Sequence, residues 1–214
     1  GGTSWAPASA SFTTGASFNL LISEFMAAND SIEVPGAIPG AIEDWIEIHN
    51  AGPDPLDLAG WHLTDNRSDL DKWTFPADTI VPSGGFLVVF ASGKDTADAN
   101  GFFHTNFKLT AAGEWLALVT PSLTVASQFG PDSADFPPQS DDVSYGRHPV
   151  TGSSVYFSTP SPGAINDPNG VMRVADTTFS PGRGSHQSPP PLTPPTPTPP
   201  PPPRFTPHPH PTAP

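Results

Sequence analysis

The sequence predicts an all-β domain, a sandwich or a barrel, followed by an extended tail. Short segments that alternate apolar and polar residues are separated by turns rich in glycine and proline, as in all-β proteins. No segment has the 3.6-residue periodicity of an amphipathic helix. Residues 189–214 contain 15 prolines, which fix φ and remove the backbone donor, and this tail is therefore predicted to adopt polyproline II conformation.

The chain begins with a segment that is predicted to be an extended arm. Residues 1–18 are small and polar, with Trp5, Phe12 and Phe18 as isolated apolar positions. The mostly apolar run at 20–26 is the first predicted strand. Because the chain opens without a methionine, we expect a processed or trimmed form.

Three further strands are predicted before the middle of the chain. After a loop at 29–41, residues 44–50 alternate apolar and polar side chains with period 2, which is typical of a half-buried strand. The alternation continues over 56–63 around Gly60, and residues 72–76 form another short strand. The turn at 51–55, which contains Gly52, Pro53 and Pro55, separates the first two of these strands.

The second half of the domain continues the same pattern. Aromatic and β-branched residues predict a strand at 86–90, and a polar loop is expected at 91–106. Residues 106–109 and 114–119 are predicted to pair as a hairpin around a turn that contains Gly113.

Two more strands and a closing segment complete the domain. A strand is predicted at 124–129, and a short one at 143–147 is expected at a sheet edge. The proline- and glycine-containing segment 159–164 closes the domain, and 170–179 is predicted to be one further strand outside it. The four parts of the chain are then the arm at 1–18, the domain at 19–168, an extra strand and joint at 169–188, and the tail at 189–214.

The four tryptophans of the domain alternate with polar neighbours. This pattern predicts that they fill the space between the sheets. They are Trp45, Trp61, Trp73 and Trp115.

Composition excludes several functions. With 21 acidic residues against 8 lysines and arginines, the net charge of −13 argues against binding to nucleic-acid backbones and to anionic lipid. No apolar run reaches the ~18 residues of a membrane span, so membrane insertion is not expected. Without cysteine, the chain has no disulfide and no thiolate metal site.

Eight blocks of sequence carry a family resemblance in their order and spacing. They lie at 21–29, 44–50, 58–65, 72–76, 85–94, 104–109, 114–119 and 143–147. These blocks resemble the lamin-tail domains of bacterial proteins and cover about residues 19–165. The resemblance implies an immunoglobulin-like β-sandwich without known catalytic residues, in exported surface proteins that also carry hydrolases or adhesive modules. Residues 174–184 resemble the start of a second β domain, which does not follow here.

No motif predicts catalysis. The sequence lacks a nucleophile elbow, a zincin motif and a phosphate loop, since position 88 is Val where the loop before Lys94 needs glycine. His49, His62 and His104 are scattered and are interpreted as strand-surface or loop residues. We therefore expect that the chain is not an enzyme and has no cofactor.

Calcium is the one ion that the sequence allows. Residues 65–71 offer several carboxylate and amide oxygens in one loop, but lack the glycine and the final glutamate of an EF-hand and include Arg67. A solvated acidic loop is therefore the favoured interpretation. The same alternatives apply, with weaker support, to Asp132, Asp135, Asp141 and Asp142.

Candidate glycosylation sites fall in predicted loops and in the tail. Asn29 and Asn66 begin acceptor triplets. Threonines among prolines resemble O-glycosylated stalks, and the alternative is an unmodified linker. These residues are Thr193, Thr196, Thr198, Thr206 and Thr212.

The favoured function is a non-catalytic, glycosylated subunit of an extracellular filament or surface layer. An extended segment of one copy would pair with a sheet edge of another, head to tail, with other copies and covalent glycans as the partners. The anchoring residues are expected among Phe12, Phe18, Val171, Val174 and Phe179. Two alternatives are a binding or adhesion module for a polysaccharide or cell-wall partner within a larger exported protein, and an accessory domain of an exported hydrolase.

Overall fold

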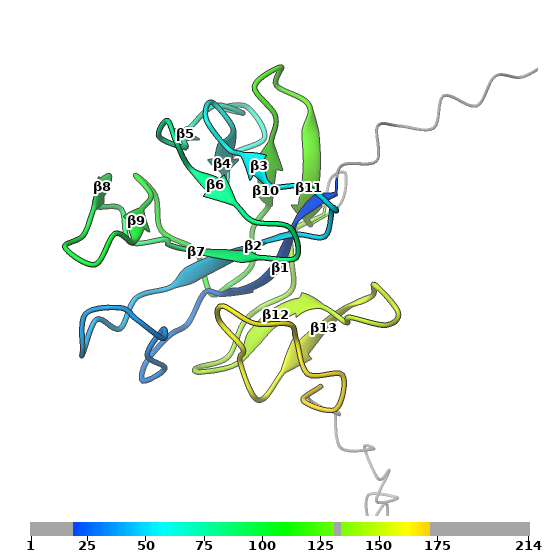
Figure 1. Ribbon diagram of the computed structural model, residues 1–214. Coiled ribbons are helices and arrows are strands. Elements are labelled where there is room, and N and C mark those ends of the chain that lie inside the picture. Colours follow the sequence, from blue (N-terminus) through cyan, green and yellow to red (C-terminus); the bar gives the residue numbers. More distant parts are fainter. Residues whose placement is uncertain (1–18, 131–133, 172–214) are drawn as a thin grey trace, which may run out of the picture. The chain divides into compact units, whose positions relative to one another are not determined.

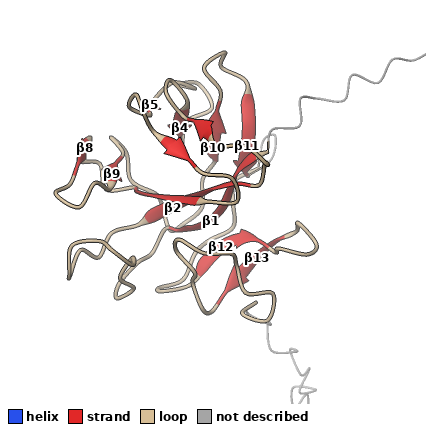
Figure 2. Ribbon diagram, in the orientation of Figure 1, coloured by secondary structure: helices blue, strands red, loops and turns tan. Residues whose placement is uncertain are grey.

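The domain is an all-β sandwich, as expected. The computed structural model describes residues 19–130 and 134–171, and these contain strands and loops but no helix (Figures 1 and 2). None of these residues therefore belongs to a helix that is long and apolar enough to cross a membrane. The described residues belong to the compact unit Gly1–Arg173. The predicted arm and proline-rich tail lie outside the described residues.

One layer of the sandwich is a seven-stranded sheet. Its neighbouring strands are antiparallel, except that β7 and β9 run parallel. In spatial order it contains β13 (Ser154–Phe157), β12 (Ser144–Arg147), β1 (Leu20–Met26), β2 (Trp45–Asn50), β7 (Phe86–Phe90), β9 (Phe103–His104) and β8 (Thr96–Ala97). In Figure 1, β1 and β2 run through the middle of the domain, and β12 and β13 form a hairpin on one side of them.

The other layer is a four-stranded sheet with a small companion. In order it contains β11 (Val125–Phe129), β10 (Leu116–Val119), β4 (His62–Thr64) and β5 (Trp73–Thr74). A two-stranded sheet pairs β3 (Leu56–Asp57) with β6 (Ile80–Val81). The buried Asn50 side chain at the end of β2 donates to the backbone oxygens of Asp54 and Val81, and so ties this small sheet to the larger one.

Alternate residues of the central strands build the core between the two layers. Ile46 and Ile48 of β2 and Leu116 and Leu118 of β10 are fully buried in one cluster. Because side chains alternate across a strand, their neighbours face the outside of the sandwich. Phe25 lies in the same cluster and makes an edge-on contact with Phe129, with ring centroids 5.1 Å apart.

Arg147 connects the two sheets along one side of the sandwich, between β1 and β11. From β12, its guanidinium donates to the backbone oxygens of Ile22 (3.2 Å) and Gln128 (3.0 Å) and lies over the ring of Phe129. The Ser127 hydroxyl also accepts from the Ile22 amide at 3.1 Å. These contacts occupy the outer edge of β11, which would otherwise be an unpaired strand edge.

Three predictions of local structure are wrong. Residues 106–109 do not form a strand that pairs with 114–119, because β10 pairs with β4 and β11 instead. Lys108 makes a single bridge to Ser92, and the predicted loop at 91–106 contains the two-residue strands β8 and β9. Strand 143–147 is not an edge, because β13, which the sequence analysis missed, pairs with its outer side.

The prediction for the tryptophans is wrong for two of the four. Trp73 lies in the main core and Trp61 packs against it. Trp45 and Trp115 lie in separate clusters, because they have the opposite parity to the core residues Ile46 and Leu116. Both strands are buried on both faces, so alternation alone does not show which face meets the other sheet.

Gly146 provides a test of the close approach between β1 and β12. A Cβ at this position would lie 2.5 Å from the backbone oxygen of Ser23 and 3.0 Å from the Cα of Glu24. We expect Gly146→Ala to lower the free energy of unfolding by about 1–3 kcal/mol, because backbone must move to admit the methyl group. Urea denaturation measures the effect, and Ser154→Ala on the neighbouring strand is the control. Equal stability of the two variants would contradict the packing described.

Candidate functional site

The face of the seven-stranded sheet that points away from the core contains two buried acids. Glu24 of β1 lies opposite Glu47 of β2, and both side chains have zero exposed surface. The register shifts between Ile22 and Glu24, so that Ser23 is an extra residue in β1. This bulge brings the Ser23 hydroxyl against the Glu47 carboxyl group.

Glu24 is held by two serines. The hydroxyl of Ser144 donates to its Oε1, and the hydroxyl of Ser161 donates to its Oε2 at 3.0 Å. The backbone amide of Ser161 lies 3.2 Å from the same Oε2. Burial raises the pKa of Glu24, while the hydrogen bonds from Ser144 and Ser161 act in the opposite direction.

Glu47 makes two short contacts through its carboxyl group. Its Oε2 accepts from the Gly163 amide at 2.6 Å, and its Oε1 lies 2.5 Å from the hydroxyl oxygen of Ser23. The Ser23 hydroxyl also reaches the backbone oxygen of Glu47, so it can donate there and accept from a proton on Oε1. Burial raises the pKa of Glu47 to about 8, with a further contribution from the nearby Glu24. The proton is therefore retained at neutral pH.

Asn166 completes the attachment of the segment that covers these acids. Its Nδ2 donates to the backbone oxygens of Ser23 (3.2 Å) and Arg147 (2.9 Å), and its Oδ1 lies 3.1 Å from the Ser161 hydroxyl oxygen, which it shares with Glu24. With Ser161 and Gly163, it anchors residues 158–166, which we call the cover segment, over β1 and β2. Because solvent does not reach either carboxyl group, the pair acts as a structural attachment for this segment.

Two hollows flank the ring of Phe86 on the same face. The smaller, which we call the Phe86 cavity, has a volume of about 230 Å³ and is formed by the ends of β1, β2 and β7, the β12–β13 turn and the cover segment. Its walls include Leu21, Ala51, Phe86, Pro149 and Ile165. The larger and more open hollow, of about 530 Å³, lies between Phe86, Phe102 and Pro162.

The three histidines named from the sequence lie in different places. His49 stacks on Phe86, with ring centroids 4.3 Å apart, and burial lowers its pKa. The ring of His62 is bonded to the Thr74 hydroxyl at 2.9 Å. His104 is buried against Phe90.

His104 links a serine and an aspartate that the sequence analysis did not bring together. Its Nδ1 lies 2.8 Å from the Ser92 hydroxyl, and its Nε2 lies 3.7 Å from Asp98. Ser92 and His104 are only 5% and 4% exposed, and neither lines the Phe86 cavity or the larger hollow. Asp98 also accepts from the amides of Asn100 and Phe102. The arrangement therefore fastens the β8–β9 loop to the sheet.

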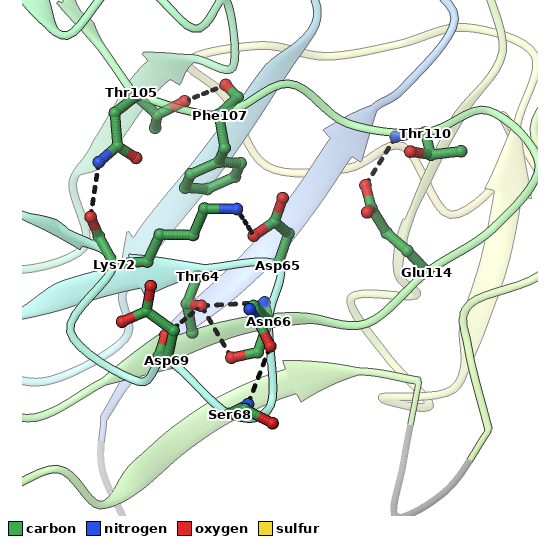
Figure 3. A network of polar contacts seen from close by, with 11 residues as sticks. Thr64, Asp65, Asn66, Ser68, Asp69, Lys72, Thr105, Phe107, Thr110 and Glu114 are labelled. Carbon is green, nitrogen blue, oxygen red and sulfur yellow. Dashed lines mark hydrogen bonds and ion pairs between the residues drawn. The ribbon is translucent and has the colours of Figure 1, made fainter.

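The acidic loop at 65–71 is closed by its own hydrogen bonds. The Thr64 hydroxyl donates to the backbone oxygen of Asp69 and accepts from the Asn66 amide, while the Lys72 ammonium lies 2.5 Å from Asp65 (Figure 3). The described residues contain no group of three or more acids or histidines arranged to hold a metal. Calcium binding here stays a prediction, for which Lys72 is an electrostatic obstacle.

The other named aspartates serve separate loops. Asp142 accepts hydrogen bonds from the hydroxyl of Ser31 and from the amides of Ser31 and Asp30. These hydrogen bonds lower the pKa of Asp142. Asp135 pairs with Arg67 at 3.1 Å. Asp141 is exposed, and Asp132 lies outside the described residues.

The two acceptor asparagines differ in their environments. Asn29 is half-buried, and its Nδ2 donates to the backbone oxygens of Ile32 (2.9 Å) and Glu43 (2.8 Å). A sugar on Nδ2 would replace one of these bonds. Asn66 is exposed, and its Oδ1 accepts from the Ser68 amide within the loop.

Of the predicted anchoring residues, only Val171 is described. It bridges Phe157 of β13 in antiparallel fashion. Phe12, Phe18, Val174 and Phe179 lie outside the described residues, as do the tail threonines.

The sequence analysis missed Glu24, Glu47 and Asn166. The available signal was the position of the two glutamates between apolar neighbours, with Phe25 after Glu24 and isoleucines on both sides of Glu47. Glu47 fits the period-2 pattern of a half-buried strand, in which it is expected to face solvent. Only the cover segment, more than 100 residues later in the sequence, buries it.

Comparison with known families gives one match. The model of the Lamin Tail Domain matches residues 13–133, which is more than half of the 214 residues. The last block quoted from the sequence, 143–147, lies beyond the matched region. No curated protein matches the chain at a significant level.

Glu47 makes the stability of the fold depend on pH. The unfolded carboxyl group loses its proton near its ordinary pKa of 4.5, whereas the folded group keeps it until about pH 8. Unfolding therefore releases a proton between these values, so the free energy of unfolding decreases as pH rises through this window, by up to about 1.4 kcal/mol per pH unit. Above pH 8 this contribution is constant.

We expect Glu47→Gln to abolish this dependence, because a glutamine amide can donate to Ser23 and accept from Gly163 as the protonated acid does. The variant should gain stability relative to the wild type between pH 5 and pH 8, as measured by urea denaturation. The control is Glu33→Gln, since Glu33 is exposed. A pH profile of Glu47→Gln that parallels the wild type would refute the assignment of the proton.

Proposed function

Because the chain belongs to the lamin tail domain family, whose immunoglobulin-like fold indicates a non-catalytic binding or structural module, we propose that it is a structural subunit whose copies join through their extended terminal segments. In this proposal the assembly is a glycosylated filament or surface layer outside the cell. The main support is the outer edge of β13, which is unpaired over Ser154–Tyr156 and bridged to Val171 at Phe157.

The other sheet edges in the described part of the chain are short or covered. β8 and β5 each have two residues. β11 is longer, but Arg147 from β12 bonds to its outer backbone. β13 has four residues and a partner strand on one side only. An unpaired strand offers main-chain donors and acceptors to an incoming strand, which is how strand addition gains affinity.

The outer side of β13 already accepts an antiparallel partner at one end. Val171 bridges Phe157, and the amide of Ser158 donates to the backbone oxygen of Gly170 at 3.0 Å. A strand from a second copy that displaced Val171 and adopted the same register would place its Val174 opposite Ser154. Such a contact joins two different surfaces, so it propagates from copy to copy as a filament.

A second candidate function is a binding module of a larger exported protein, for a polysaccharide or cell-wall partner. The open hollow of about 530 Å³ between Phe86, Phe102 and Pro162 favours it. Aromatic rings beside an open hollow suit sugar rings, which stack on them. A monomeric protein that binds cell-wall polysaccharide would favour this function over the first.

The edge of β13 can be tested without disturbing β12. The amide of His148 donates to the oxygen of Ser153, and hydrogen-bonded pairs alternate along an antiparallel ladder, so the amide of Ser154 points away from β12. We expect Ser154→Pro to raise the concentration needed for assembly by about tenfold or more, since proline removes this donor. Ser154→Ala keeps the donor and should assemble as the wild type does.

Sedimentation velocity and electron microscopy of the full chain give the measurement. Wild-type protein that stays monomeric at every concentration contradicts the proposal as a whole. Assembly that is unaffected by Ser154→Pro contradicts the role of β13.

Glycan attachment is a separate prediction of the proposal. We expect glycopeptide mass spectrometry of native material to find sugar on Asn66 rather than Asn29, because Asn66 is exposed while the amide of Asn29 is engaged. Asn66→Gln should remove that mass. Sugar on Asn29 alone would show that attachment precedes folding, against this expectation.

A further inference from the structure

We propose that the Phe86 cavity receives the side chain of Phe12 from the N-terminal arm of a second copy. This inference rests on the proposed self-association and identifies the surface that receives the arm. It is supported by the chemistry of the cavity, by the place where the arm joins the domain, and by the composition of the arm.

The cavity suits a hydrocarbon ring because its polar groups already have partners. His148 accepts from the amides of Val150 and Thr151, and Asn166 is bonded to Ser23, Arg147 and Ser161. His49 stacks flat on Phe86, at an interplanar angle of 9°. The remaining walls include Leu21 and Pro149. An aromatic side chain can therefore enter without displacing the hydrogen bonds of His148 and Asn166.

Exposed apolar residues surround the mouth of the cavity. Ile165, which lines it, is 66% exposed, and Val150, next to the lining residue Pro149, is 79% exposed. These are the two most exposed of the large hydrophobic residues in the described part of the chain. Because Ile165 and the neighbour of Pro149 lie near the same cavity, we interpret them as parts of an interaction surface and not as isolated exposed residues.

The arm meets the domain at this cavity. The first described residue, Asn19, accepts a hydrogen bond from the amide of Ala51 at 2.8 Å, and Ala51 and Leu21 both line the cavity. The arm has no charged residue, whereas the chain has a net charge of −13. An arm of one copy can therefore approach the acidic domain of another without repulsion between the two.

Length favours Phe12 and a second copy. Phe18 directly precedes the first described residue, Asn19, so it is too close to its own domain to reach a neighbouring copy. Phe12 lies seven residues before Asn19, which corresponds to about 23 Å of extended chain. That length is enough for Phe12 to reach a neighbouring copy.

The two proposed contact surfaces adjoin each other. The β12–β13 turn supplies Pro149 and Gly152 to the cavity, and β13 begins at Ser154. One end of the domain can therefore receive both the arm and a strand from neighbouring copies.

Cysteine cross-linking of the full chain tests the inference, because the chain has no cysteine of its own. We expect a chain with Ser11→Cys, mixed with a chain carrying Ala51→Cys, to form a disulfide-linked dimer under mild oxidation. Ala99→Cys is the control, since Ala99 is also an exposed alanine and does not line the cavity. A double variant, Ser11→Cys with Ala51→Cys, that links within one chain instead of between chains would overturn the assignment to a second copy.

Assembly measurements separate this inference from the proposed function. Phe12→Ser and Ala51→Trp should each raise the concentration needed for assembly by about tenfold or more, as loss of a buried aromatic anchor does, while Ala99→Trp should not. If the wild type never assembles, the proposed function fails and this inference fails with it. If the wild type assembles and these variants behave as Ala99→Trp does, the inference alone is wrong.

Discussion

The burial of two carboxyl groups on one face of the large sheet is the constraint on which the rest of the structure depends. Glu24 and Glu47 lie side by side with no exposed surface, and an ionised pair at this position would be strongly unfavourable. The proton on Glu47 and the donors from Ser144, Ser161 and Gly163 make the burial possible. The carboxyl groups in turn hold the cover segment against the sheet, so the second face of the sheet is closed by polar contacts.

The cover segment also contributes to the two surfaces that are proposed to bind other copies of the chain, the Phe86 cavity and the edge of β13. The cover segment forms one wall of the Phe86 cavity and leads through Asn166 to Val171, which bridges β13. Asn166 is bonded to both Ser23 and Arg147, so β1, β12 and the cover segment are fixed relative to one another. The cavity and the edge of β13 are therefore connected parts of one end of the domain, although the residues that form them are far apart in the sequence.

The sequence predicts the strands well and their partners poorly. Runs such as 86–90 and 44–50 carry strong β-forming residues between turns, and the strands β7 and β2 lie there. The parity of Trp45 and Trp115 could not be assigned, because strands buried on both faces have no polar side to orient them. β13 was missed although Val155, Tyr156 and Phe157 are strong strand formers, because the strand is only four residues long. The interior position of β12 was missed with it. The roles of Glu47 and Asn166 depend on contacts across more than 100 residues, which local patterns do not contain.

In the proposed assembly, the strand edges that remain unpaired determine where a second copy can add a strand. A sandwich with several long free edges would pair with copies of itself in many ways and aggregate. In the described residues, Arg147 covers β11, and β5 and β8 are too short to hold a partner strand, so β13 is the edge left to receive one. The first described residue, Asn19, accepts from the cavity residue Ala51, and the last, Val171, bridges β13, so the chain enters and leaves the domain beside this receiving end. In the proposed assembly, an arm and a cavity are unlike surfaces, and a contact between them builds a chain of copies when the rotation between neighbours does not close into a ring.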